Sequence, residues 1–85
     1  MIVNGTTANT NIPVTGILTT DTLQTVFLIE GNAGTAVILG ITVLISPNRV
    51  LSTNITAFCS ITSNGNIQST LDTTNKILVV SWTRP

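Results

Sequence analysis

The sequence predicts an all-β fold, a small antiparallel β-sandwich of the jelly-roll or immunoglobulin-like type with about 6–8 short strands. Three observations predict this fold. Short runs alternate apolar and polar residues, as half-buried strands do, and no stretch has the periodicity of a helix. The apolar runs are rich in Val, Ile and Thr, which favour strands. Clusters of Gly, Pro, Asn, Asp and Ser separate the runs roughly every 8–12 residues, a spacing typical of sandwiches and barrels.

The first half of the chain follows this pattern. A strand start or edge segment is expected at 14–18, directly after Pro13, because a missing N–H is harmless at an edge. Thr and Asp side chains that can bond nearby backbone predict a turn at 19–22. Residues 23–30 alternate cleanly, with apolar side chains on both faces, and are expected to form a central strand. The segment 31–34, rich in Gly and Asn, should then connect a hairpin.

The middle of the chain is its most apolar part. Residues 37–45 are predicted as a single strand, because the density of β-branched residues and the internal Gly40 both disfavour a helix. A turn is expected at 46–49, which has Pro at its second position. A short strand at 50–53 and a further strand at 55–61 should follow.

The last third contains the strongest hairpin signal. The pair Asn64 and Gly65 accepts the left-handed backbone of a type I′ turn, whose twist matches that of the flanking strands. Residues 67–70 are expected to return from this turn and 71–75 to form a loop. The final strand is expected at 76–83 and contains the only Trp.

The N-terminal segment 1–12 is polar, rich in Thr and Asn, and is expected to be an arm or an early edge strand rather than part of the core. We therefore divide the chain into a flexible or partner-ordered arm, 1–12, and a single sandwich domain, 13–85. The segment has neither the basic start nor the apolar stretch of a signal peptide, so no export is expected.

Charged residues are scarce in this chain. Three basic and three acidic residues make up 7% of it, and the formal net charge is zero. Without a cluster of Lys and Arg the electrostatic basis of nucleic-acid binding is missing, so no nucleic-acid partner is expected. The longest apolar run, 36–45, is about half as long as a membrane-spanning helix, so no membrane partner is expected. Hydroxyl and amide groups must therefore hydrate the surface in place of charges, or neighbouring chains must cover much of it.

No arrangement of catalytic residues is visible in the sequence. The chain has no His, so Cys59 cannot form a Cys–His pair or a Cys–His metal site, and we expect no enzyme activity, metal or cofactor. Cys59 is expected to pack in the core as a small apolar side chain. The three acids, Asp21, Glu30 and Asp72, are expected to form turns or to solubilise strand ends rather than to act as an acid–base pair.

Two aromatic residues, Phe27 and Trp82, could in principle stack on a sugar. They lie in separate strands, and no Tyr accompanies them. A Trp at the end of a terminal strand more often fills the core or a subunit contact, and this is the expectation for Trp82.

The small size of the chain predicts self-association. A domain of 8.9 kDa buries only about 63% of the surface that its unfolded chain exposes. Small domains compensate with disulfides, metals or partner chains, and the single Cys and the missing His remove the first two. We therefore expect a homo-oligomer. Val26 and Leu28, on the second apolar face of the 23–30 strand, are the candidates for the subunit contact.

Three segments of the chain resemble small virion proteins of tailed bacteriophages. The segment ITSNGNIQST at 61–70 is similar to a turn that precedes a Thr- and Asn-rich loop in those proteins, and NKILVVSW at 75–82 is similar to their final strand. The segment VTGILTTDTL at 14–23 is similar to their first strand and turn. The three segments together make up about a third of the chain.

The resemblance implies a capsid decoration, or cement, protein that is made in the host cytoplasm and binds the major capsid protein on the surface of the virion. Such proteins often form trimers, so a homotrimer is favoured. The polar arm is the candidate for capsid contact, through hydrogen bonds rather than ion pairs. Its contact residues are expected to be Ile2, Val3, Asn4, Thr6, Thr7 and Asn9. The alternative is a tail or head fibre module that binds host surface carbohydrate.

Overall fold

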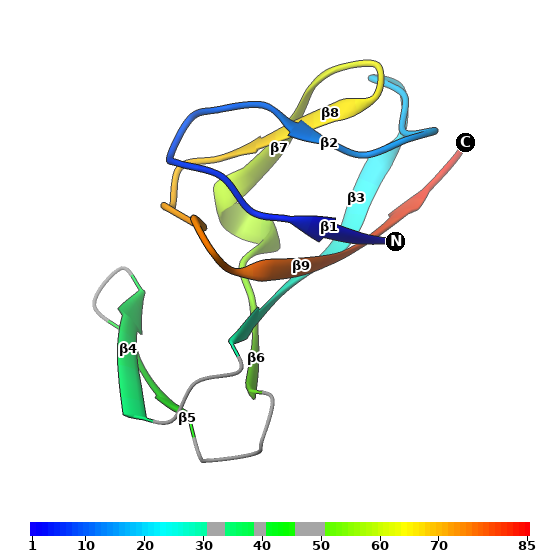
Figure 1. Ribbon diagram of the computed structural model, residues 1–85. Coiled ribbons are helices and arrows are strands. Elements are labelled where there is room, and N and C mark those ends of the chain that lie inside the picture. The colour runs from blue at the N-terminus through cyan, green and yellow to red at the C-terminus, as the bar shows by residue number, and fades with distance from the viewer. Residues whose placement is uncertain (31–33, 39–40, 46–50) are drawn as a thin grey trace.

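The computed structural model describes residues 1–30, 34–38, 41–45 and 51–85 (Figure 1). Within these residues the chain forms nine strands and one short 3-10 turn, η1. The elements are β1 (Ile2–Asn4), β2 (Ile12–Pro13), β3 (Thr22–Glu30), β4 (Gly34–Ile38), β5 (Ile41–Ile45), β6 (Leu51–Asn54), η1 (Thr56–Phe58), β7 (Cys59–Ser63), β8 (Asn66–Ser69) and β9 (Ile77–Thr83).

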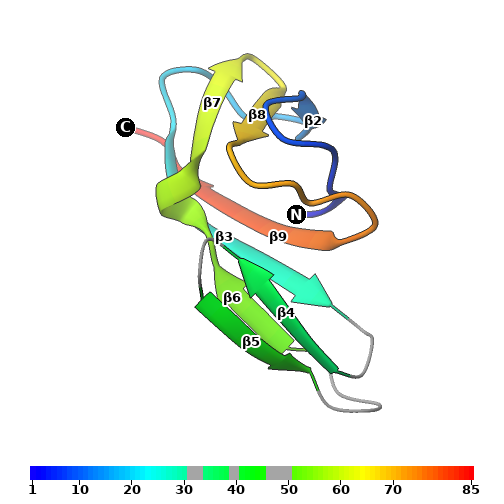
Figure 2. The same ribbon diagram turned by 90° about the vertical axis from the view of Figure 1, so that its left-hand side faces the viewer.

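The strands form a sandwich of two antiparallel sheets. The large sheet has the order β1-β9-β3-β6 and the small sheet the order β2-β8-β7. Figure 2 shows β7, β8 and β2 lying above β9 and β3, so the two sheets enclose the space between them. A separate antiparallel pair, β4 and β5, lies on the side of the large sheet away from the small one. The prediction of an all-β sandwich is confirmed.

The core lies between the two sheets and is built from alternate residues of their strands. On β3 and β9, every second side chain points inward, which buries Val26, Leu28, Leu78 and Val80. The small sheet and its loops supply the opposing side chains. The buried apolar residues of the described chain are Ile12, Val14, Ile17, Val26, Leu28, Ile55, Ile67, Leu71, Leu78 and Val80.

The longest predicted strands agree best with the structure. Residues 23–30 lie within β3, and 76–83 contain β9. The two strands pair along most of their length, from Thr22 with Thr83 to Ile29 with Ile77, with one irregularity between Leu23 and Thr25.

The segment 14–18 is not a strand, contrary to the prediction. The short strand β2 ends at Pro13, and the chain then turns, with the Ile17 N–H donating to the Val14 carbonyl at 3.3 Å. Val14 and Ile17 are nevertheless completely buried. The apolar residues that suggested a strand are thus core residues carried by a turn.

The prediction of one strand at 37–45 is also wrong. Antiparallel pairing joins Gly34 to Ile45 and Ile38 to Ile41, so the chain reverses within this apolar run and forms two strands. Alternation of residue type continues across such a reversal, which is why the sequence pattern did not reveal it. The predicted turn at 46–49 and residues 31–33 of the predicted connection 31–34 lie outside the described residues, whereas Gly34 begins β4.

The predicted strand at 55–61 begins later than expected. The 3-10 turn η1 occupies 56–58, and β7 starts at Cys59. The turn shifts the alternation, so that Phe58, Cys59 and Ile61 all pack against the core.

The predicted hairpin at Asn64 and Gly65 is confirmed, because β7 and β8 flank it and Ser63 pairs with Asn66. Its type I′ geometry is not confirmed. Gly65 has a φ of 84°, whereas Asn64 is not among the described residues with positive φ. A type I′ turn requires positive φ at both positions.

The N-terminal segment is the edge of the large sheet and not a free arm. β1 pairs with β9, from Ile2 with Val79 to Asn4 with Ile77. Beyond β1, the Gly5 N–H donates to the Lys76 carbonyl at 2.9 Å. Ile12, at the end of the supposed arm, is 1% exposed and belongs to the core. Of the two readings of this segment, the early edge strand is therefore correct, and the division at residue 12 does not separate two structural parts.

Candidate binding surfaces

The outer face of the large sheet carries an apolar band that we call the outer stripe, made of Ile2, Phe27, Ile29, Ile77 and Val79. Strand pairing brings these residues together. Val79 lies opposite Ile2 on one side and opposite Phe27 on the other, and Ile29 lies opposite Ile77. They alternate with the buried residues of the same strands, so they face away from the core.

Two residues of the outer stripe, Ile2 and Ile77, are exposed, the other three are half-buried, and the neighbours of the stripe are polar and uncharged. Ile2 is 72% exposed and Ile77 44% exposed, and these two are among the most exposed large apolar residues of the described chain. Asn4 and Asn54 flank the stripe on β1 and β6. At one end the hydroxyls of Thr25 and Ser81 bond to each other across β3 and β9. A contiguous apolar band with a polar rim is typical of a protein-binding surface.

Val26 and Leu28 are not available for a subunit contact, contrary to the prediction. They are 0% and 3% exposed within the isolated chain. The small sheet covers the face of β3 that carries them, so the fold itself accounts for their burial. The residues on the opposite face of β3, Phe27 and Ile29, are the ones that reach the surface.

The six predicted capsid-contact residues of the supposed arm have different positions in the fold. Ile2 and Asn4 are exposed on β1, whereas Val3 packs against the core. Thr6 is held by Thr73: the Thr6 N–H donates to the Thr73 Oγ1 at 2.9 Å, and the Thr73 N–H donates to the Thr6 carbonyl at 2.9 Å. This part of the chain is therefore ordered by its own domain.

The remaining two, Thr7 and Asn9, lie in the exposed connection between β1 and β2. The Asn9 N–H donates to the Ser69 carbonyl at 2.7 Å, which attaches the connection to β8. Capsid contact through the exposed residues of this segment stays a prediction.

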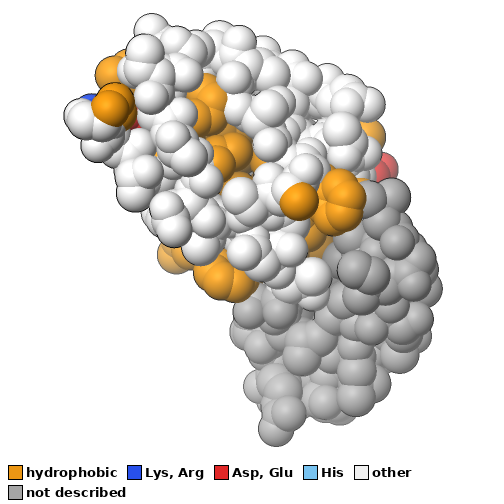
Figure 3. All heavy atoms as spheres, turned by 180° about the vertical axis from the view of Figure 1, so that it is seen from behind, with side chains coloured by type: hydrophobic (Ala, Val, Ile, Leu, Met, Phe, Trp, Pro, Cys, Tyr) orange, Lys and Arg blue, Asp and Glu red, His pale blue; other side chains and the backbone are white. Residues whose placement is uncertain are grey.

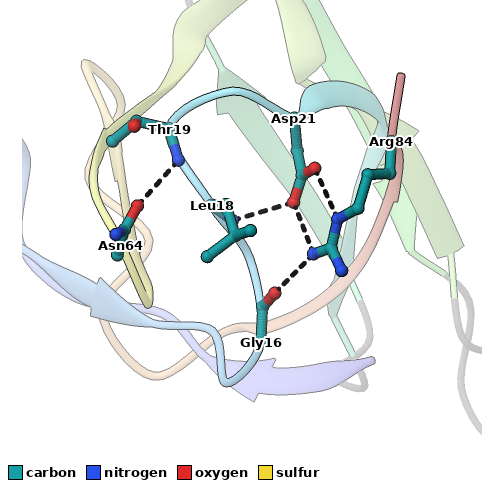
Figure 4. Close-up of polar contacts among 6 residues, drawn as sticks. All are labelled: Gly16, Leu18, Thr19, Asp21, Asn64 and Arg84. Carbon is teal, nitrogen blue, oxygen red and sulfur yellow. Dashed lines mark hydrogen bonds and ion pairs between the residues drawn. The ribbon is translucent and has the colours of Figure 1, made fainter.

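A buried carboxylate closes one end of the sandwich (Figure 4). The Asp21 side chain is fully buried and accepts hydrogen bonds from Arg84 Nε and Nη2, both at 2.9 Å. The same Arg84 Nη2 donates to the Gly16 carbonyl at 2.8 Å, and the Leu18 N–H donates to Asp21 Oδ2 at 2.8 Å. The arrangement joins the end of the chain to the turn before β3.

The hydrogen bonds from Arg84 hold the pKa of Asp21 below its ordinary value, against the opposing effect of burial, and the Leu18 N–H and the charge of Arg84 add to the lowering. The pair cannot be predicted from the sequence, because its two members lie 63 positions apart. The prediction that Asp21 forms a turn is confirmed, since its N–H also donates to the Leu18 carbonyl at 2.9 Å.

Asp72 also forms a turn, as predicted. Its Oδ1 accepts hydrogen bonds from the Thr74 N–H at 2.9 Å and from the Thr74 hydroxyl at 2.6 Å. These bonds lower the pKa of Asp72. The turn sets the direction in which the chain enters β9.

A shallow groove of about 300 Å³ lies between β3 and β7, and it is lined by Thr19, Asp21, Thr22, Leu23, Cys59, Ser60 and Ile61. In the view from behind, a group of hydrophobic side chains lies near the middle of the face, surrounded by other side chains and backbone (Figure 3). Cys59 is half-buried and packs against the core, as predicted. Burial raises the pKa of its thiol, which keeps the thiol protonated at neutral pH.

Phe27 and Trp82 do not form a joint platform for a sugar. Trp82 lies on β9 in alternation with the buried Leu78 and Val80, and it packs against the core. Phe27 lies on the outer face, opposite Val79. The two rings therefore lie on opposite faces of the large sheet.

In the part of the chain that the structure describes, no group of three or more His, Cys, Asp or Glu side chains could hold a metal ion. No helix among the same residues has the length and apolarity that a membrane crossing requires. No family model, curated protein or solved structure matches the chain.

Proposed function

We propose that this chain is a capsid decoration protein of a tailed-phage virion, and that the outer stripe is the surface that binds the major capsid protein. The outer stripe is the single observation that carries the proposal. A sheet face with Ile2 72% exposed and Ile77 44% exposed is better suited to burial against a large protein surface than to permanent contact with water.

The composition of the chain supports the same function. With 7% charged residues and no net charge, the domain has little electrostatic protection against association. A subunit that remains attached to a shell has less need of such protection than a free monomer. The resemblance of 14–23, 61–70 and 75–82 to small virion proteins points to the shell of a phage as the binding partner.

The fibre module that binds carbohydrate is the alternative, and the positions of the aromatic rings do not favour it. Sugar-binding surfaces rely on aromatic faces that a sugar ring can stack on. Trp82 packs against the core, and Phe27 is half-buried on the other face of the sheet.

Quantification of this chain in purified particles of the phage that encodes it tests the proposal. Decoration of the capsid predicts a copy number comparable with that of the major capsid protein. A copy number far below that of the major capsid protein would favour the fibre module. Complete absence of the chain from purified particles would contradict both virion functions.

A further inference from the structure

β1 is an edge strand of the large sheet, and its backbone groups either bond β9 or point away from it. The Met1 ammonium donates to the Val80 carbonyl and the Val80 N–H donates to the Met1 carbonyl, both at 2.8 Å. Four residues further along the same register, the Gly5 N–H donates to the Lys76 carbonyl. In an antiparallel pair, residues that bond the partner strand alternate with residues that do not. Met1, Val3 and Gly5 therefore bond β9.

It follows that the N–H and C=O groups of Ile2 and Asn4 point away from β9, toward the open edge of the large sheet. Within the described residues β1 is the end strand of this sheet and pairs with β9 alone. Figure 1 shows β1 on the near side of the molecule, in front of β9. The edge is thus a row of backbone donors and acceptors beside the 72% exposed side chain of Ile2.

Natural edge strands avoid pairing by being very short or by means of charged side chains, Pro or bulges. β1 is short, with three residues, but it lacks the other three protections. β1 has the sequence IVN, with no charge and no Pro, and its pairing with β9 shows no irregularity. By contrast β2, which is an edge strand of the small sheet, ends in Pro13.

We propose that β1 pairs with β1 of a second copy of this chain, in antiparallel orientation about a two-fold axis at Val3. The outward-pointing groups of β1 are self-complementary in this register. Ile2 lies opposite Asn4 of the second copy, and each pair exchanges both of its backbone hydrogen bonds. A two-fold arrangement is the commonest symmetry of homo-oligomers.

The pairing joins two large sheets into one continuous sheet. Its strand order is β6-β3-β9-β1 in one copy, followed by β1-β9-β3-β6 in the second copy. It also places the two outer stripes side by side on one face, because pairing preserves the alternation of side chains. The paired residues Ile2, Val3 and Asn4 bring no charged side chains to the contact. The isologous contact closes at two copies, in contrast to the trimer that the sequence resemblance implies.

Hydrogen exchange of the unmodified chain tests the pairing directly. The Asn4 amide points outward and should exchange quickly in dilute protein, whereas the Val3 and Gly5 amides are bonded to β9 and serve as internal controls. At high protein concentration the Asn4 amide should exchange roughly tenfold more slowly once about nine-tenths of the chains are paired. An Asn4 exchange rate that is the same in dilute and concentrated protein would overturn the proposal.

A substitution at the same position provides the second test. Asn4→Pro removes the outward N–H and leaves the bonds of Val3 and Gly5 to β9 in place, whereas the control Asn4→Ala retains the N–H. Wild type and Asn4→Ala, with any tag at the C-terminus, should reach twice the monomer mass of 8.9 kDa in sedimentation at high concentration. Folded Asn4→Pro should remain at the monomer mass. A dimer of Asn4→Pro, or a wild type that is a monomer or a trimer throughout, would refute the pairing.

The inference does not depend on the proposed function. The dimer can form whether or not the chain binds a capsid, and capsid binding through the outer stripe does not require β1 to pair. Copy number in particles tests the function, and exchange of the Asn4 amide tests the dimer, so the two can fail separately.

Discussion

At the scale of single residues, the most consequential contact joins Asp21 to Arg84. A fully buried carboxylate would be unfavourable in isolation, and the two hydrogen bonds from Arg84 and one from the Leu18 N–H compensate for its lost hydration. No local pattern could have predicted the pair, because it depends on how the end of β9 meets the turn before β3. The acid at Asp72, by contrast, bonds a residue two positions away, and its turn could be predicted from the sequence alone.

These carboxylates make stability depend on pH in the acid range. The folded-state pKa values of Asp21 and Asp72 lie below the ordinary value of about 4. The stability they contribute is therefore complete above that value, and it is lost as the pH falls through the lowered pKa values. The melting temperature of the wild type should be nearly constant from pH 5 to pH 8 and fall below pH 4.

Asp21→Asn should lower the melting temperature at pH 7 and make the decline in acid shallower than in the wild type, because the ion pair with Arg84 is lost. Asp72→Asn is the matched control, since Asp72 is exposed and lies in a local turn. Its effect at pH 7 should be smaller. Equal melting temperatures of wild type and Asp21→Asn at pH 7 would contradict the structural role assigned to the pair.

Gly5 occupies a position with no room for a side chain. A Cβ at this residue would overlap the carbonyl oxygen and the side chain of Thr73, which bonds Thr6. Gly5→Ala should therefore destabilise the fold by about 1–3 kcal/mol in denaturant unfolding, the range for overpacked sites. The neighbouring substitution Asn4→Ala, at an exposed position, should change stability by less than about 0.5 kcal/mol. A Gly5→Ala variant as stable as Asn4→Ala would show that the close contact does not exist.

At the scale of elements, the alternation of apolar and polar residues predicts β3 and β9, but it does not identify which face of β3 lies in the core. Both faces of β3 contain apolar residues, and the choice depends on the small sheet, whose residues are distant in sequence. The sequence therefore predicts a subunit contact for Val26 and Leu28, whereas the structure buries both side chains in the core. The outer stripe also depends on contacts between segments that are distant in sequence, because only the pairing of β1, β9 and β3 brings Ile2 beside Val79 and Phe27.

The two faces of β3 should respond differently to substitution. Leu28→Ala removes a buried side chain and should cost about 2–5 kcal/mol of unfolding free energy. Phe27→Ser, one residue away on the outer face, should cost less, because Phe27 is only half-buried. Denaturant midpoints of the two variants measure the difference. A larger loss for Phe27→Ser than for Leu28→Ala would reverse the assignment of the faces.

At the scale of the whole molecule, the fold presents an uncharged sheet face and an open edge strand on the same sheet. Both features follow from a sequence with few charges, whose strands carry apolar residues on two faces. The sequence predicted an association-prone sandwich for this reason. It could not predict the position of the association surface, because Ile2 lies in a polar segment and no local pattern reveals its pairing with β9.

Binding to the shell should be nearly independent of salt. The outer stripe and its neighbours Asn4, Asn54, Thr25 and Ser81 carry no charge, so few ion pairs can be screened. Occupancy of particles by the chain should be the same in low salt and in molar NaCl. Release of the bound chain by NaCl alone would show that charged residues elsewhere provide the contact.

The central claim is that the outer stripe attaches this chain to the capsid, and binding to particles that lack the chain tests it most directly. The variant Ile77→Ser changes an exposed residue of the stripe, and the matched control Leu18→Ser changes an apolar residue of similar exposure, 37% against 44%, outside it. We predict that the wild type and Leu18→Ser occupy the particles equally and that folded Ile77→Ser binds at least tenfold more weakly, a difference of about 1.4 kcal/mol. Equal binding of Ile77→Ser and Leu18→Ser, or no binding of the wild type, would contradict the claim.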